Sequence, residues 1–144
     1  MVRPSRKADY ALRASLDLAL NAGPERLVRT SEIARRTGTP SKFLEAILSQ
    51  LGAAGLVQSQ RGARGGHRLA RAPSSVTVGD VLQVAGGVLP ARVRPPRPGD
   101  GPGRAVDRLW EAVEKAVQET VEGVTLEDLA RQAQRVSSVP DYSI

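Results

Sequence analysis

The chain has 144 residues, enough for one core of ordinary size with an appended element but too few for two full domains. It contains no cysteine and one histidine, which excludes disulfides, thiolate catalysis and cysteine-ligated metal sites. The formal charge of +6 is uneven, because residues 1–73 carry 13 Lys+Arg against 5 Asp+Glu and residues 74–144 carry 8 against 10. We therefore expect the N-terminal half to meet a polyanion.

Other function classes find little support in the composition. No stretch approaches the roughly 18 apolar residues of a membrane span, and residues 1–10 lack the apolar run of a signal peptide. We expect a cytoplasmic protein with no membrane partner. The carboxylates are scattered over predicted solvated helix faces, so we predict no catalytic residue and no enzyme.

Two helices are predicted first along the chain. Residues 5–20 place apolar side chains at three- to four-residue intervals, which is the spacing of one helical face. Residues 21–24, Asn-Ala-Gly-Pro, end this helix. A second, short helix is predicted to begin with Thr30 as its N-cap and to end at Gly38.

A third helix follows the tripeptide 38–40, in which Thr39 is predicted to cap and Pro40 to occupy the first helical position. It is predicted to run to Gly55. Two helices joined by a short glycine-containing turn predict a helix-turn-helix. Its third helix leaves these residues off the apolar stripe: Ser41, Lys42, Glu45, Ala46 and Ser49. They form either a solvated face or the face that a DNA groove contacts.

Residues 56–60 and 67–70 are predicted to form two short strands around the glycine-rich segment 61–66, which carries Arg61 and Arg64. Such a segment is a solvated turn, a phosphate-binding loop or a wing. It lacks the Gly-Lys-Ser/Thr ending of a nucleotide-binding loop, and its place after a helix-turn-helix favours a wing. For His67 we favour a structural or phosphate-contacting role over a metal ligand or a pH switch.

The C-terminal half is predicted to be helical on both sides of a loop. Thr77 and Asp80 form a capping-box pattern for a helix that ends at residues 86–87. Five of the ten prolines lie in residues 88–103, which predicts a loop. A long helix from Arg104 to Glu122 and a short one capped by Thr125 follow. The long helix has an apolar seam: Val106, Leu109, Trp110, Val113, Val117 and Val121.

We therefore predict a mainly α fold with a small β-wing, in which a winged helix-turn-helix head carries a long C-terminal dimerisation helix. The predicted units are a DNA-binding domain over 1–85, a Pro/Gly-rich loop over 86–103, a dimerisation helix with a short C-terminal helix over 104–136, and a tail over 137–144. The seam is either core within one subunit or a dimer face. Its place after a long loop favours the dimer.

Segments 5–20, 31–57, 61–71 and 76–82 resemble, in their order and spacing, the Rrf-two family of winged helix-turn-helix transcriptional regulators, and residues 109–130 are similar too. The resemblance implies a homodimer whose long helices cross between subunits. It implies that the helix around Lys42 and Glu45 reads the major groove, with Glu45 contacting a base. The wing residue Arg61 would reach the minor groove.

The chain departs from this family at the cluster site. The family's sensors hold an iron-sulfur cluster through three cysteines in the loop that corresponds to residues 88–106, and this chain has none. Asp9 matches the position of an acidic ligand, but one carboxylate does not hold such a cluster. We expect a cluster-free regulator with no cofactor. Its signal would come from an unidentified small molecule in the crevice between head and dimer helix, from a protein partner, or from neither.

The predicted function is sequence-specific DNA binding by a homodimeric transcriptional regulator, a repressor, on an inverted-repeat operator of double-stranded DNA. The alternative is a winged-helix module that binds protein instead of DNA. The predicted DNA-contacting residues are Thr30, Ser41, Lys42, Glu45, Ala46, Arg61, Arg64 and His67.

Overall fold

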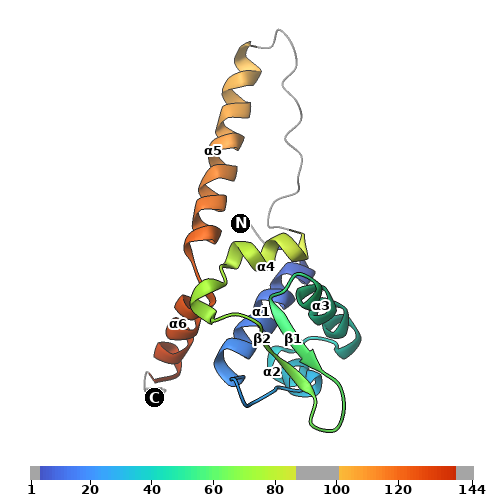
Figure 1. The fold of residues 1–144 in the computed structure, drawn as a ribbon. Helices are drawn as coiled ribbons and strands as arrows, with labels where there is room; N and C mark the ends of the chain where they lie inside the picture. Colours follow the sequence, from blue (N-terminus) through green and yellow to red (C-terminus); the bar gives the residue numbers. More distant parts are fainter. Residues whose placement is uncertain (1–3, 87–100, 139–144) are drawn as a thin grey trace, which may run out of the picture.

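The computed structural model describes residues 4–86 and 101–138, so most of the predicted tail and most of the predicted loop lie outside the described residues. The helical segments are α1 (Arg6–Asn21), α2 (Thr30–Thr37), α3 (Ser41–Ala53), the 3₁₀ turn η1 (Pro73–Ser75), α4 (Val78–Ala85), α5 (Gly101–Gly123) and α6 (Leu126–Ser138). The strands are β1 (Val57–Gln60) and β2 (Gly66–Leu69). The predicted fold class, mainly α with a small β-wing, is confirmed (Figure 1).

Helix α1 is the centre of the head, where it packs against α2, α3, α4 and α6. Its face toward these helices carries Ala8, Ala11 and Ala14, all fully buried. Side chains this small let neighbouring helices approach closely, because the distance between helix axes depends on the side chains at the contact. Ser5 caps the helix by accepting the Ala8 N–H at 3.1 Å.

The starts of α2 and α3 differ from the sequence prediction by one residue each. Arg29, not Thr30, occupies the N-cap position of α2. Pro40, not Thr39, precedes α3. Thr39 is buried, and its hydroxyl lies 2.8 Å from the Thr37 hydroxyl. The hydroxyl of Thr30 lies 2.8 Å from His67 Nε2. Thr30 and Thr39 therefore bond other side chains and do not cap the helices that they were predicted to cap.

An ion pair between the exposed Arg36 and the buried Asp17 holds α2 against α1. Asp17 is 7% exposed and accepts hydrogen bonds from Arg36 at 2.7 and 3.0 Å. The paired N–H groups of a guanidinium match the two oxygens of a carboxylate, which fixes orientation as well as distance. Helix α2 ends at Gly38, whose φ of 68° is left-handed and favours glycine, as the predicted turn requires.

The wing is an antiparallel pair of strands in which Val57 lies opposite Leu69 and Gln60 opposite Gly66. Backbone hydrogen bonds of 2.7 and 2.9 Å also join His67 to Val28, in the segment before α2. At Gly66 an added Cβ would lie 2.8 Å from the Val28 carbonyl oxygen, so only glycine fits there. The wing is thus anchored to the helix-turn-helix by its own second strand.

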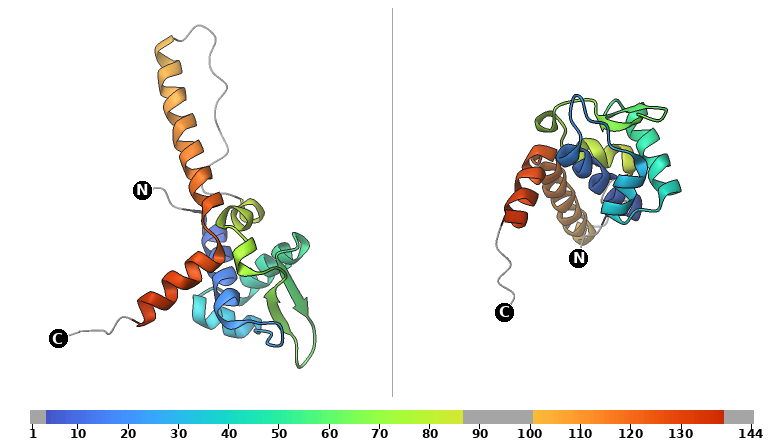
Figure 2. Two further views of the ribbon diagram at one scale, coloured as in Figure 1. Left: turned by 60° about the vertical axis from the view of Figure 1, so that its left-hand side comes forward. Right: turned by 90° about the horizontal axis from the view of Figure 1, so that it is seen from below.

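Helix α6 packs on the head, although the sequence grouped it with the long helix. Its first residue, Leu126, is fully buried and donates its N–H to the Val76 carbonyl at 2.9 Å. The predicted capping boxes at Thr77 and Thr125 are present. The head therefore comprises α1–α4, the wing and α6, and α5 projects from it (Figures 1 and 2).

Helix α5 begins at Gly101, three residues before the predicted start, and none of its residues is buried. Its base lies against α4, where a Cβ added at Gly79 would meet the Val121 carbonyl oxygen and Glu122 Cγ at 3.4 Å each. Farther out, Val106, Leu109 and Trp110 are 54–59% exposed. No helix within residues 4–86 and 101–138 is long and apolar enough to cross a membrane.

Candidate nucleic-acid interface

An open hollow of about 700 Å³ lies where α3, the start of α2 and the wing meet. We call it the reading hollow. Helix α3 contributes Ser41, Glu45 and Ser49, and its apolar side chains Leu44 and Ile47 are buried on the opposite face. The other lining residues are Arg29, Thr30, Ser31, Ser59, Gln60, Arg61, Gly62, Gly65, Gly66 and His67.

His67 links the two walls of the reading hollow. Its Nε2 lies 2.8 Å from the hydroxyl of Thr30, the first residue of α2. Its Nδ1 lies 2.6 Å from the hydroxyl of Ser59, its partner across the wing strands. Partial burial lowers the pKa of His67 from its ordinary value, because desolvation disfavours the imidazolium. The neutral ring therefore joins the wing to the helix-turn-helix.

Arg29 makes a second link across the hollow. Its guanidinium donates a hydrogen bond to the backbone carbonyl of Ala63, at the tip of the wing. The N-cap of α2 thus holds the tip, and the imidazole of His67 holds the strands. Together they fix where the wing arginines stand relative to α3.

The structure brings together five of the eight residues that were predicted to contact DNA. Thr30, Ser41, Glu45, Arg61 and His67 all line the reading hollow.

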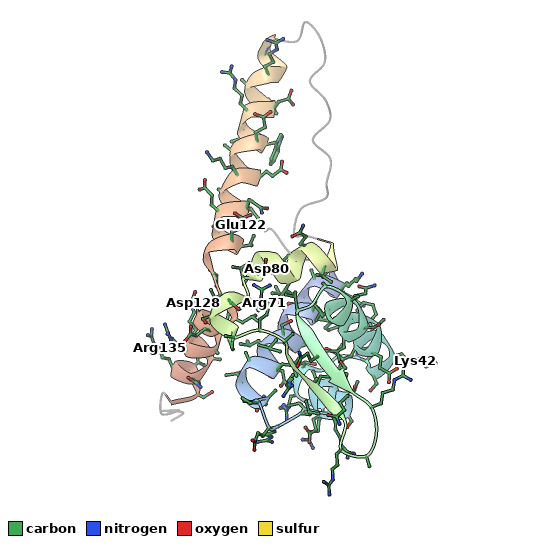
Figure 3. The ribbon with its side chains drawn as sticks, in the orientation of Figure 1. Lys42, Arg71, Asp80, Glu122, Asp128 and Arg135 are labelled. Atoms are coloured by element: carbon green, nitrogen blue, oxygen red, sulfur yellow. The ribbon has the colours of Figure 1, made fainter. Side chains whose placement is uncertain are left out.

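The other three predicted residues lie outside the reading hollow. Lys42 and Ala46 are exposed on α3, and Lys42 points outward from the head (Figure 3). Arg64 lines a neighbouring hollow with Arg68 and Glu25. No finding tests a DNA contact for any of the eight, so these assignments stay predictions.

Sequence reasoning missed Arg29 and Ser59 in the reading hollow. Their roles depend on contacts to Ala63 and His67, which lie 34 and 8 residues away along the chain. Ser59 is two residues after the buried Val57 along β1, so strand periodicity could have placed Ser59 on the same face of the wing as Val57. Nothing in the local pattern around Arg29 indicates its contact with the wing tip.

The predicted dimer seam is divided by the structure. Near the base of α5, Val121 packs against the core of its own head, and Val117 lines a cavity beside α4. Val106, Leu109 and Trp110 stand away from the head with half or more of their surface exposed. Val113 lies between these groups and is partly exposed. The outer part of the seam is thus the apolar face that the head leaves uncovered.

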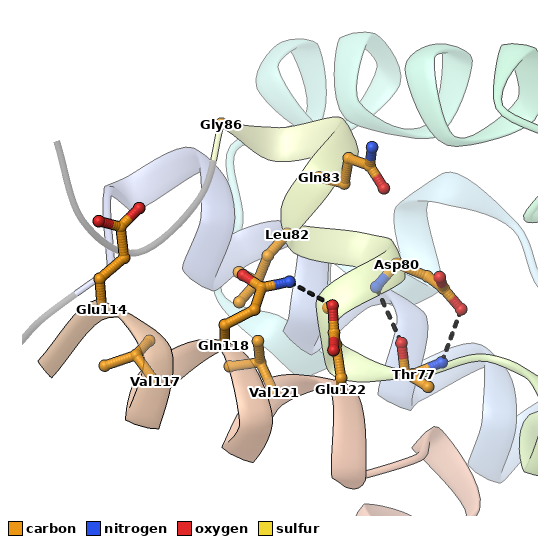
Figure 4. Close-up of a pocket in the computed structure, with 11 residues that line it drawn as sticks. Thr77, Asp80, Leu82, Gln83, Gly86, Glu114, Val117, Gln118, Val121 and Glu122 are labelled. Atoms are coloured by element: carbon orange, nitrogen blue, oxygen red, sulfur yellow. Dashed lines mark hydrogen bonds between the residues drawn. The ribbon is translucent and has the colours of Figure 1, made fainter. Parts of the chain in front are cut away.

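A crevice of about 520 Å³ separates α4 from the base of α5 (Figure 4). Its lining includes the carboxylates of Asp80, Glu114 and Glu122 and the apolar side chains Val117 and Val121. The crevice lies between the head and the long helix, where a small-molecule effector is predicted to bind. This role stays a prediction.

The residues present do not fit an iron-sulfur cluster. Such a cluster needs several thiolates or histidines in their place, and the chain has no cysteine and one histidine. That histidine bonds Thr30 and Ser59 on the wing side of the head. Asp9 is paired with Arg13 at 2.9 Å on the surface of α1. Within residues 4–86 and 101–138, no three His, Asp or Glu side chains are grouped to hold a metal ion.

A family model named Rrf2, described as an iron-dependent transcriptional regulator, matches residues 4–132. The chain is 35% identical to the HTH-type transcriptional regulator CymR of Bacillus subtilis over 88% of both chains. It is 34% identical to the regulator IscR of Aliivibrio salmonicida over 91% of this chain and 80% of that one.

Solved structures agree with this likeness. IscR of T. potens superposes with a TM-score of 0.79 at 34% identity, over 97% of this chain and 94% of that one. CymR of B. subtilis superposes with a TM-score of 0.77 at 33% identity, over 92% of this chain and 98% of that one. These relatives match both the head and the long helix.

Proposed function

The chain belongs to the Rrf2 family of transcriptional regulators, and from that premise we propose that it is a homodimeric repressor that binds an inverted-repeat operator without an iron-sulfur cluster. The observation that carries the proposal is the reading hollow. There, the exposed face of α3 and the wing open onto one concave surface. Residues 1–73, which form most of the head, carry 13 Lys+Arg against 5 Asp+Glu.

The proposed readout divides between the two grooves of DNA. Helix α3 enters the major groove, where the Glu45 carboxylate accepts a hydrogen bond from the amino group of cytosine. Arg61, exposed at the start of the wing turn, enters the narrow and electronegative minor groove. Lys42, on the outer edge of α3, contacts backbone phosphate and adds affinity without sequence preference.

The proposed dimer forms through the outer part of α5. A face containing Val106, Leu109 and Trp110 costs free energy while it stays in water, and a second copy of the same helix covers it. Two heads related by a two-fold axis then read half-sites in opposite directions, which makes the operator an inverted repeat.

The test begins with selection of bound duplexes from a random pool by the full chain. We expect an inverted-repeat motif, two chains for each duplex, and an affinity that falls steeply with salt because bound counterions are released. Binding that ignores salt, or one chain for each site, contradicts the proposal. Transcription from a promoter that carries the selected site then decides between repression and activation.

Arg61→Ala tests the reading surface. We expect a loss of roughly 1–3 kcal/mol in binding to the selected duplex, with the fold unchanged because the side chain is exposed. Arg13→Ala is the matched control. It removes an exposed arginine of α1 whose ion pair with Asp9 contributes little to the free energy of unfolding. Equal binding by both variants, measured by fluorescence anisotropy, would remove Arg61 from the interface.

A further inference from the structure

The imidazole of His67 uses both of its nitrogens inside the reading hollow. Nε2 lies 2.8 Å from Thr30 Oγ1, and Nδ1 lies 2.6 Å from Ser59 Oγ. All three side chains line the hollow, so each hydroxyl is within reach of a molecule that occupies it. The three groups form a chain of hydrogen bonds from the start of α2 to the wing.

The protonation state of this ring decides what the two hydroxyls can donate. A neutral imidazole has one N–H and one lone pair, so one hydroxyl accepts from the ring and the other must donate to it. An imidazolium has two N–H groups, so both hydroxyls accept from the ring. Both hydroxyl hydrogens are then free to point into the hollow.

A backbone phosphate of DNA fits the protonated arrangement. Phosphate oxygens accept hydrogen bonds and carry negative charge, so they gain from two donated hydroxyls and from the cationic ring beside them. The charged side chains that share the hollow are Arg29, Glu45 and Arg61. The two arginines favour the same phosphate and oppose protonation of the free ring, whereas Glu45 favours protonation.

We propose that the Thr30–His67–Ser59 chain is a phosphate-contacting site of the DNA interface, in which His67 takes up a proton when DNA binds and turns both hydroxyls toward the phosphate. The inference rests on the proposed function of the reading hollow. His67 acts as a positioning residue, because the hydroxyls of Thr30 and Ser59 make the contacts.

Two further observations support this assignment. Burial lowers the pKa of His67, so the ring is neutral in the free protein at neutral pH and has a proton to gain. The chain has one histidine and no cysteine, so no other side chain has an ordinary pKa between the carboxylates and tyrosine. Among the side chains, His67 is therefore the one to which proton uptake near neutral pH is assigned.

The experiment measures binding of a duplex selected by the wild-type chain, by fluorescence anisotropy at constant ionic strength between pH 5.5 and 7.5. Affinity should rise as pH falls, by at most about tenfold per pH unit for each head, which is the limit for one proton. Calorimetry in two buffers of different ionisation enthalpy should show net proton uptake near pH 7.

His67→Gln is the decisive variant. An amide keeps one donor and one acceptor but cannot be protonated. We expect this variant to bind within about threefold of wild type at pH 7.5, a difference of less than 1 kcal/mol in binding free energy, and to lose the rise at low pH. Thr30→Val and Ser59→Ala should each weaken the rise. Ser31→Ala is the matched control, because this hydroxyl lines the hollow without bonding His67, and it should keep the full rise.

The outcomes separate this inference from the function on which it rests. Salt-dependent binding by wild type with no proton uptake overturns the inference and leaves DNA binding intact. A rise at low pH that persists in His67→Gln overturns it as well. No binding to any selected duplex at any pH overturns the proposed function itself. If His67→Gln misfolds by circular dichroism, loss of the rise in both Thr30→Val and Ser59→Ala supports the inference, and its retention in both contradicts it.

Discussion

In α3 the apolar side chains Leu44, Ile47 and Leu48 are at most 2% exposed, whereas in α5 Leu109 and Trp110 are 57% and 59% exposed. Both helices repeat their apolar residues at intervals of three and four. The difference lies in what covers the stripe, since α3 is covered by α1, α2 and β1, whereas the described head elements leave the outer part of α5 exposed. Apolar spacing therefore identifies a face that needs a partner and does not say which chain supplies it.

Truncation of a head residue should give the largest loss of stability. Leu44→Ala removes a fully buried side chain, and we expect a loss of about 2–5 kcal/mol in the free energy of unfolding at every protein concentration. Urea denaturation at two protein concentrations measures this loss. Leu109→Ala is the contrast, with a cost that appears only where chains associate. Equal, concentration-independent losses would place both residues in one intramolecular core.

A charge on α5 should break the association and leave the head folded. Leu109→Asp places a carboxylate in the proposed dimer face, where it must lose its water without gaining a partner. We expect monomers at micromolar concentration by light scattering, with unchanged helix content by circular dichroism. Lys115→Asp, on the opposite face of α5, is the control and should stay dimeric. An unchanged mass for Leu109→Asp would move the dimer interface elsewhere.

The head and α5 should also differ in their response to acid. The lowered pKa of His67 means that the unfolded chain binds more protons than the folded head below the ordinary value near 6.5. The free energy of unfolding should therefore fall as pH drops from about 6.5 through the folded pKa of His67. Thermal unfolding should show this decline, and His67→Gln should remove that part of it. Self-association through α5 should not follow the same titration.

The smallest expected effect is that of iron and sulfide on either region. Anaerobic reconstitution should produce no visible cluster absorption, because the chain has no thiolate to ligate iron. Operator binding should be equal under air and under reductant. Stoichiometric cluster uptake, or loss of binding on oxidation, would contradict the cluster-free assignment.

The sequence predicted the elements well where one local pattern was enough. The glycine that ends α2, the capping boxes at Thr77 and Thr125 and the two wing strands follow from short-range rules and are present. Helix starts were less predictable, because Thr30 and Thr39 both have the side chain of an N-cap. Only their partners, His67 for one and Thr37 for the other, show that neither caps.

Long-range contacts account for what the sequence could not provide. The Thr30–His67 bond joins residues 37 positions apart, and no periodicity encodes it. The packing of α6 against α1 is similarly unpredictable. The sequence around Leu126 is compatible with a helix that extends the long helix and also with a helix that packs in the core of the head. The reading hollow was predictable as a set of polar residues, but the contacts that hold the wing in place were not.

The base of α5 fits closely against α4 at Gly79. The helix has 23 residues and is about 35 Å long at 1.5 Å per residue, and its lower end rests on α4 within 3.4 Å of where a side chain at Gly79 would begin. A tilt of 5° about that point displaces the far end by about 3 Å. In a dimer joined through α5, such a tilt changes the separation of two heads that must match half-sites spaced by about 34 Å, one helical turn. In the proposed dimer, a change in the gap between α4 and α5 would therefore change the span of the two heads on DNA.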